Sequence, residues 1–207
     1  TIYYSRKLGG AQSDQNWTAN NAWSLVGVDG TSAGNAEPGA GDVAIIGRSR
    51  SSGETHRIRA NVSLEVAAIV FEEDPSPVVS YNTGRLFFDA GTTNHKLGAV
   101  SGEGEFQLFF SQTSDIPTFD QSNTDLGQFV NEPNSIWNVS HEGSGGTGNI
   151  AEMPSFPSEF PNLRITASGA TNAADKSYGS GSNDINVIRF NNDIVVNESF
   201  TVGNKAA

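Results

Sequence analysis

Two short apolar stretches, Arg85-Leu86-Phe87-Phe88 and Gln107-Leu108-Phe109-Phe110, decide the fold class of this chain. Each follows a glycine within a few positions, and turn-forming residues separate the two. A motif that returns at an interval of roughly 20–50 residues is the sequence signature of stacked repeats such as solenoids and propellers. The two stretches therefore predict neighbouring strands of a repeating β-fold.

Strand signals of the same kind, short runs rich in β-branched and aromatic residues, occur along most of the chain. They predict strands at Asp42–Ile46, His56–Arg59, Val62–Phe71, Arg85–Asp89, Glu105–Ser111, Leu163–Ala167, Ile185–Phe190, Ile194–Val196 and Phe200–Val202. Helical spacing of apolar residues is not sustained over any window of about 11 residues. Because no helices alternate with the strands, the pattern disfavours a doubly wound α/β fold.

The expected fold is all-β: a right-handed parallel β-solenoid, or β-helix, whose coils stack so that free strand edges persist only at the ends. An antiparallel β-sandwich is the alternative, because short strands with regular turns fit it equally well. We expect residues 1–207 to form a single body, with residues 1–47 as an N-terminal cap. Residues 112–161 hold five of the eight prolines and are expected to form a long, loop-rich excursion from that body.

Charge and composition exclude several classes of function. The net charge is −11, so the chain lacks the basic surface that neutralises nucleic-acid phosphates or docks on anionic lipid. There are no cysteines, which excludes a disulfide framework and thiolate catalysis. No apolar run approaches the roughly 20 residues that a membrane-spanning helix needs. We therefore expect neither a nucleic-acid partner nor a membrane span.

The spacing of the histidines and glycines does not indicate a catalytic constellation. His56, His95 and His141 lie too far apart for an H-x-H or H-E-x-x-H motif, and each is expected in a surface or turn position. Residues 143–148 formally match G-x-G-x-x-G. Two prolines follow closely, so the long helix that would hold a phosphate group cannot form there, and a flexible loop is predicted.

Acidic residues are the remaining candidates for catalysis. Glu103 and Glu105 are two apart and would share one face of a strand, and a glycosidase needs two carboxyl groups roughly 5–10 Å apart. A second acidic cluster comprises Glu72, Glu73 and Asp74. Neither group is accompanied by the arginines and lysines with which a lyase would bind an acidic polysaccharide. A solvated acidic face is the preferred interpretation, and no catalytic residue is predicted.

Calcium is the only cofactor that the sequence leaves open. Asp184 and Asp193 lie among asparagines, whose side-chain oxygens are suitable calcium ligands. The EF-hand and Gly-Gly-x-Gly-x-Asp patterns are absent, so no cofactor or metal site is predicted.

Three N-terminal segments and two later ones form a pattern of their own. They are Tyr3–Arg6, Asn16–Ser24, Pro38–Gly47, Phe160–Thr166 and Asp193–Val202. The first three resemble the opening of large exported surface proteins of Bacteroidetes-type bacteria, and the last two are similar to the repeating coils of those proteins. The resemblance implies a β-helical, adhesin-like body exported by the type nine secretion route. It also implies that the chain is the N-terminal part of a longer protein, because no sorting domain is visible.

The tryptophans have two candidate roles. Trp17 and Trp23 lie six residues apart, where they could shield the open apolar end of the first coil, as terminal coils of solenoids require. Alternatively, Trp17, Trp23 and Trp137 could bind glycans by stacking exposed rings on sugars. We favour capping for the first two, because large aromatic rings usually contribute buried area.

Together these observations predict a non-enzymatic structural or adhesive segment of an exported protein at the outer face of a Gram-negative outer membrane. Its partners would be secretion machinery, other cell-surface proteins or glycans. Two other classes remain as alternatives. One is a β-helical carbohydrate-active enzyme, either a polysaccharide lyase or a glycosidase, and the other is a glycan-binding module.

Overall fold

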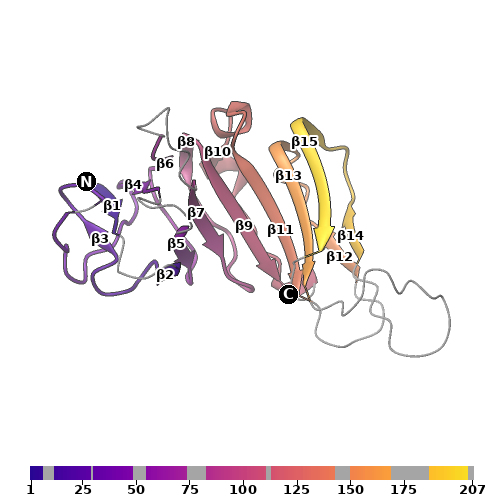
Figure 1. The fold of residues 1–207 in the computed structure, drawn as a ribbon. Helices are drawn as coiled ribbons and strands as arrows, with labels where there is room; N and C mark the ends of the chain where they lie inside the picture. Colours follow the sequence, from indigo (N-terminus) through magenta and orange to yellow (C-terminus); the bar gives the residue numbers. More distant parts are fainter. Residues whose placement is uncertain are drawn as a thin grey trace.

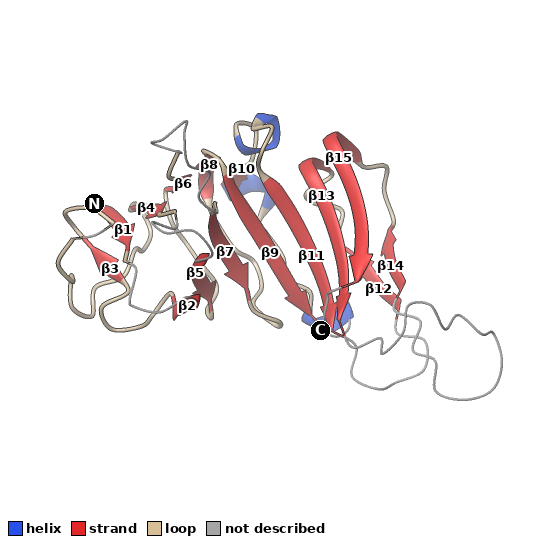
Figure 2. Cartoon of the chain, in the orientation of Figure 1, coloured by secondary structure: helices blue, strands red, loops and turns tan. Residues whose placement is uncertain are grey.

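The computed structural model describes residues 1–6, 12–28, 30–48, 55–73, 83–110, 113–142, 150–168 and 187–204. In this part of the chain nearly all regular structure is β-strand, joined by turns and by the short 3-10 helices η1 (Thr113–Asp115), η2 (Gln121–Asn123) and η3 (Phe129–Asn131) (Figure 2). None of the described helices is long and apolar enough to cross a membrane. The all-β prediction is confirmed.

The strands form three sheets. In spatial order, the six-stranded sheet contains β10 (Thr124–Asp125), β8 (Gly98–Ser101), β6 (Ala68–Phe71), β4 (Val43–Ile46), β1 (Ile2–Ser5) and β3 (Trp23–Ser24). The seven-stranded sheet contains β15 (Val195–Asn204), β13 (Glu159–Ser168), β11 (Ile136–Glu142), β9 (Gly104–Phe110), β7 (Gly84–Phe88), β5 (Thr55–Ala60) and β2 (Gln12–Asn16). The two-stranded sheet contains β12 (Ile150–Met153) and β14 (Val187–Phe190). From β4 to β15, successive strands alternate between the seven-stranded sheet and one of the other two (Figure 1).

The pairing between the named strands is parallel throughout, except that β3 runs antiparallel to β1. Parallel neighbours cannot be joined by a tight hairpin and need a long crossover connection. Here the connection between two neighbours of one sheet contains a strand of another sheet. The antiparallel β-sandwich considered from the sequence is therefore wrong.

The two Leu-Phe-Phe motifs lie on the adjacent strands β7 and β9, as predicted, but they are not matched residue for residue. Leu86 pairs with Phe106, and Phe88 pairs with Leu108. The motifs are thus offset by two residues. Because side chains alternate between the faces of a strand with a period of two, this offset keeps the same face of both strands inward.

The hydrophobic core lies between the seven-stranded sheet and the other two sheets. Its buried residues form one continuous cluster. Phe106 is central to it. Its ring centroid lies 5.3 Å from that of Phe71, 5.4 Å from that of Phe88 and 5.1 Å from that of Trp137. A Cβ atom at Gly104 would overlap the ring of Phe71, so this position requires glycine. Edge-to-face contacts of this kind stabilise the core beyond the free energy gained by burying the rings.

The prediction of a loop-rich excursion over residues 112–161 is wrong for the described part of that stretch. β11 lies between β9 and β13, inside the seven-stranded sheet. The stretch also supplies many residues of the core, namely Ile116, Phe119, Leu126, Phe129, Val130, Trp137, Val139, Met153 and Phe160. Pairing on both sides of β11 outweighs the local preference of the prolines and glycines for turns.

Several predicted boundaries also change. Of the predicted strand Val62–Phe71, only β6 (Ala68–Phe71) is a strand. Residues 62–67 have no regular structure apart from a single bridge, between Glu65 and Lys96. The predicted strands Ile194–Val196 and Phe200–Val202 are parts of the single strand β15, which changes register against β13 between them. Seven of the described strands were not predicted: β1, β2, β3, β8, β10, β11 and β12.

Candidate functional site

Trp17 and Trp23 lie at the end of the core that the N-terminal strands form. Trp23 belongs to β3, the last strand of the six-stranded sheet, and Trp17 directly follows β2, the last strand of the seven-stranded sheet. The two rings meet edge to face with centroids 4.6 Å apart. The indole of Trp23 donates to the carbonyl of Trp17 at 2.8 Å, and that of Trp17 donates to the carbonyl of Pro38 at 3.2 Å. This arrangement closes the core between the two terminal strands.

None of the three tryptophans proposed for glycan binding offers a ring to a sugar. The exposed fraction is 2% for Trp17 and 0% for both Trp23 and Trp137. Trp137 lies in β11 with its ring 5.7 Å from that of Phe160, inside the core. Stacking on a sugar needs an exposed ring face, so the burial argues against this role and favours the capping interpretation for Trp17 and Trp23.

Glu105 is the most deeply buried of the acidic candidates. It projects from β9 with an exposed fraction of 1% and forms an ion pair with Arg85 of β7, whose Nε lies 2.9 Å from Oε2. Asn138 of β11 donates to the other oxygen at 2.9 Å. A buried carboxylate needs such partners on both sides, because an unpaired one is costly to desolvate. Glu105 therefore joins three neighbouring strands, and its prediction as part of a solvated face is wrong.

Glu103 lies in the turn before β9 and is engaged differently. Its Oε1 lies 3.5 Å from Nη1 of the buried Arg48, and Asn134 donates to its Oε2 at 3.4 Å. Of the second acidic cluster, Glu72 accepts the backbone N–H of Arg48 at 3.0 Å, and Glu73 is exposed. Arg48 thus organises acidic residues from two different turns, which is a structural role.

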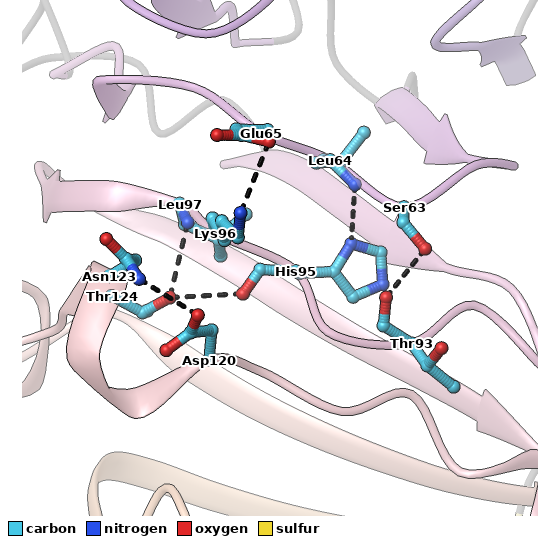
Figure 3. Close-up of polar contacts among 10 residues, drawn as sticks. All are labelled: Ser63, Leu64, Glu65, Thr93, His95, Lys96, Leu97, Asp120, Asn123 and Thr124. Carbon is cyan, nitrogen blue, oxygen red and sulfur yellow. Dashed lines mark hydrogen bonds and ion pairs between the residues drawn. The ribbon is translucent and has the colours of Figure 1, made fainter.

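His95 is a buried histidine that holds a turn in place (Figure 3). Leu64 donates its backbone N–H to Nδ1 at 3.1 Å, so Nε2 carries the proton and donates to the hydroxyl of Thr92 at 3.0 Å. Burial lowers the pKa of His95 to about 4, which keeps the ring neutral at physiological pH. The sequence placed this residue at the surface or in a turn, and the surface position is wrong.

His56 and Ser5 form a contact that the sequence did not reveal. Ser5 Oγ of β1 lies 2.6 Å from His56 Nε2 of β5, and Gly47 donates its N–H to the same hydroxyl at 2.8 Å. This distance would suit a nucleophile and its base. Both side chains are fully buried, however, so a substrate cannot reach the hydroxyl. The contact joins the two larger sheets, and it has no local sequence signal because the residues are far apart in the chain.

Four neighbouring turns form a shallow polar hollow that we call the turn groove. Residues 40–41, 65–67, 96, 98 and 121–125 line this space of about 450 Å³. Gly98 has a φ of 58°, and a Cβ atom there would overlap the carbonyl of Ala67, so the turns can approach closely only with glycine at this position.

Polar contacts stiffen the turn groove (Figure 3). The hydroxyl of Thr124 accepts from the N–H of Leu97 at 3.2 Å and donates to the carbonyl of His95 at 3.3 Å. Asp120 accepts from the side chain of Asn123 at 2.9 Å, and this bond holds the pKa of the carboxyl below its usual value. The groove offers fixed hydrogen-bonding groups and one exposed ion pair, Lys96 with Glu65 at 3.4 Å, without a nucleophile paired to a base.

The remaining sequence candidates give no site in the described residues. No group of three or more histidine, aspartate or glutamate side chains in this part of the chain could hold a metal ion, and Asp193 is exposed. Asp74, Asp184, residues 143–148 and the side chain of His141 lie outside the described residues. A calcium ligand at Asp184, which the sequence left open without predicting it, is therefore untested.

Comparison with known proteins gives no relative. No protein-family model, no curated protein and no solved structure matches the chain. Function must therefore be argued from the geometry above.

Proposed function

We propose that this chain is a non-enzymatic structural and adhesive segment of an exported cell-surface protein, built as a right-handed parallel β-solenoid. The observation that carries the proposal is the parallel seven-stranded ladder, whose successive strands are separated in the chain by strands of the other sheets. A chain that returns to the same sheet in this way winds as a coil. Crossovers between parallel strands are right-handed in about 98% of cases, which gives the proposed handedness.

The burial and pairing of the acidic and histidine side chains support a non-enzymatic role. Glu105 is buried in an ion pair, and Glu103 lies beside Arg48 and Asn134. His95 is neutral and donates to a hydroxyl in the interior. A general acid or base must reach the substrate within hydrogen-bonding distance, and buried, engaged groups do not.

The turn groove supports an adhesive role. Most of its side chains are polar or charged, and backbone contacts between neighbouring turns, such as the bond from the N–H of Val66 to the carbonyl of Lys96, hold the backbone in place. A rigid surface of this kind can bind hydroxyl-rich or peptide ligands through several weak hydrogen bonds without changing them. The proposed partners are glycans, other cell-surface proteins and the secretion machinery, and the proposed location is the outer face of the cell.

A binding and turnover panel tests the proposal. Purified protein is applied to immobilised polysaccharides and surface proteins, and both retention and product release are measured. We expect retention without turnover, weakened in Gln121→Ala/Lys96→Ala, which alters the turn groove. Gln128→Ala, an exposed residue outside the groove, serves as the matched control. Turnover that disappears in Glu105→Gln would contradict the proposal, as would a panel with no retention.

A further inference from the structure

The outer face of the seven-stranded sheet carries a second hollow, which we call the sheet hollow. Leu163 of β13 is buried in the core. Side chains alternate along a strand, so Asn162 and Arg164 project from the opposite, outer face. Residues of β11, β13 and β15 line a space of about 240 Å³ there, together with residues 133–134 of the turn before β11. The described lining contains one cation and no aspartate or glutamate.

That cation, Arg164, has no partner in the described part of the chain. The other basic side chains described donate to a backbone carbonyl, pair with a carboxylate or lie over a ring. Arg164 is the exception to this rule among the described residues. The chain has 23 acidic and only 12 basic residues. A basic side chain that finds no carboxylate in so acidic a chain is available to an anion from outside.

The surroundings of Arg164 are set by described strands on both sides. Asn138 of β11 pairs with it on one side, and Thr201 of β15 pairs with it on the other. Neighbouring strands lie about 4.8 Å apart, so the guanidinium and the hydroxyl of Thr201 can contact the same small ligand. That hydroxyl also has no hydrogen-bond partner among the described residues.

Hydrogen bonds fix the wall of the sheet hollow beside Arg164. Asn162 donates to the carbonyls of Pro133 and Ser135 at 2.7 and 2.8 Å. Its side-chain oxygen accepts from the hydroxyl of Ser199 at 2.6 Å. These bonds tie the turn before β11 to β13 and β15. The hollow is therefore held in shape before any ligand enters it, which lowers the cost of binding.

We propose that the sheet hollow binds the carboxylate of an acidic sugar, a hexuronate. The two parallel N–H groups of a guanidinium match the two oxygens of a carboxylate. One guanidinium balances one negative charge, which favours a carboxylate over a doubly charged phosphate. The hydroxyl of Thr201 can bond a ring hydroxyl, and Ile136 offers an apolar contact to the C–H groups of the ring.

The size of the sheet hollow agrees with this ligand. Pockets that enclose a drug-sized molecule measure about 300–1,000 Å³, so a smaller hollow suits one sugar residue of a longer chain. The turn groove differs, because its Lys96 is already paired with Glu65. The two sites are separate, and the proposal does not rest on the adhesive function.

Isothermal titration calorimetry with a short oligogalacturonate tests the site. We expect binding that weakens as the salt concentration rises. Arg164→Gln should weaken it at least about tenfold, because charge-assisted hydrogen bonds are lost. Arg189→Gln is the matched control, since it removes the same charge from an exposed ion pair outside the hollow, and it should leave the affinity unchanged. The methyl-esterified oligomer, which is uncharged, should bind the wild type as weakly as the acidic oligomer binds Arg164→Gln. A wild type that does not bind the acidic oligomer, or equal affinities in the wild type and Arg164→Gln, overturns the proposal.

Thermal melting with and without the oligomer gives a second test that also reports on folding. A ligand that binds only the folded state raises the melting temperature. We expect this rise in the wild type and in Arg189→Gln, but not in Arg164→Gln. Gln121→Ala/Lys96→Ala, which alters the turn groove, should keep the full rise, so failure of the groove and failure of the sheet hollow are distinguishable. A full rise in Arg164→Gln would overturn the site.

Discussion

Trp23 tests the closure of the core at the scale of a single residue. Its ring is fully buried against that of Trp17. Truncating a buried tryptophan to alanine costs roughly 3–5 kcal/mol, a large part of a typical stability of about 5–15 kcal/mol. We therefore expect Trp23→Ala to lower the melting temperature clearly in a thermal scan, and Trp23→Phe, which keeps a ring, to lower it less. An unchanged melt in Trp23→Ala would end the capping interpretation.

His95 gives the protein a predictable dependence on pH. Its pKa is about 4 in the folded state, against about 6.5 in the unfolded chain. Above pH 6.5 both states are neutral at this residue. As the pH falls from 6.5 to 4, only the unfolded state binds the proton, so about 3 kcal/mol of stability is lost across this window.

Urea denaturation of the wild type and of His95→Gln at several pH values checks this prediction. The carboxylates titrate in both proteins, so the difference between the two isolates the contribution of His95. We expect the free energy of unfolding of the wild type to fall more steeply with decreasing pH than that of the variant. Parallel curves would show that His95 is not buried as described.

Glu105 is expected to stabilise the protein and to have no part in catalysis. Glu105→Gln leaves the guanidinium of Arg85 without its carboxylate partner, which should cost roughly 1–3 kcal/mol. Glu103→Gln is the matched control, since Glu103 is partly exposed and its ion pair is longer, so it should cost less. Chemical denaturation measures both, and a larger loss in Glu103→Gln would contradict this assignment.

The arginine partners of these two glutamates could not be predicted from the sequence. Arg85 and Arg48 are distant from them in the chain, and only the register of the strands and the stacking of the turns bring them close. Burial of the tryptophans, by contrast, follows from their size and could be anticipated. Local composition therefore favoured the burial of Trp17 and Trp23 but did not show which polar residues meet.

At the scale of the element, a substitution in β11 tests whether this segment is a core strand or a projecting loop. Val139→Pro removes a backbone N–H from a strand that is paired on both sides, and the loss of its ladder hydrogen bond should cost roughly 1–3 kcal/mol. Gln128→Pro is the control, because its φ of −76° suits proline and the residue is exposed. Circular dichroism during thermal unfolding should show a large loss for the first variant alone. A small and equal loss of stability in both variants would favour the projecting loop instead.

The strands found from the sequence are those with continuous apolar or β-branched runs, such as β4, β7 and β9. β2 was missed because Gln12–Asn16 contains no apolar residue. β11 was missed although Ile136, Trp137 and Val139 stand among polar residues in a pattern close to alternation, which indicates a half-buried strand. The prolines on either side of β11 led instead to the prediction of a loop. Pairing partners distant in the chain decide such cases, and a single sequence does not show them.

At the scale of the whole molecule, the described strands form parallel ladders, and Trp17 and Trp23 close the core between the N-terminal strands. Buried hydrophobic residues, many of them aromatic, form one continuous cluster along these ladders. The proposed adhesive surface lies along the turns that follow these strands. It therefore depends on the parallel stacking of the strands.

Backbone nuclear Overhauser contacts in an isotope-labelled sample test that stacking most directly. Antiparallel strands bring opposed Hα atoms very close together, whereas parallel strands connect Hα atoms to the amides of both neighbours. We expect contacts from Trp137 of β11 to the backbone of Phe106 on one side and of Leu163 on the other, without strong Hα–Hα contacts, because all three strands are parallel. Strong Hα–Hα contacts across these strands, or none between β11 and either neighbour, would contradict it.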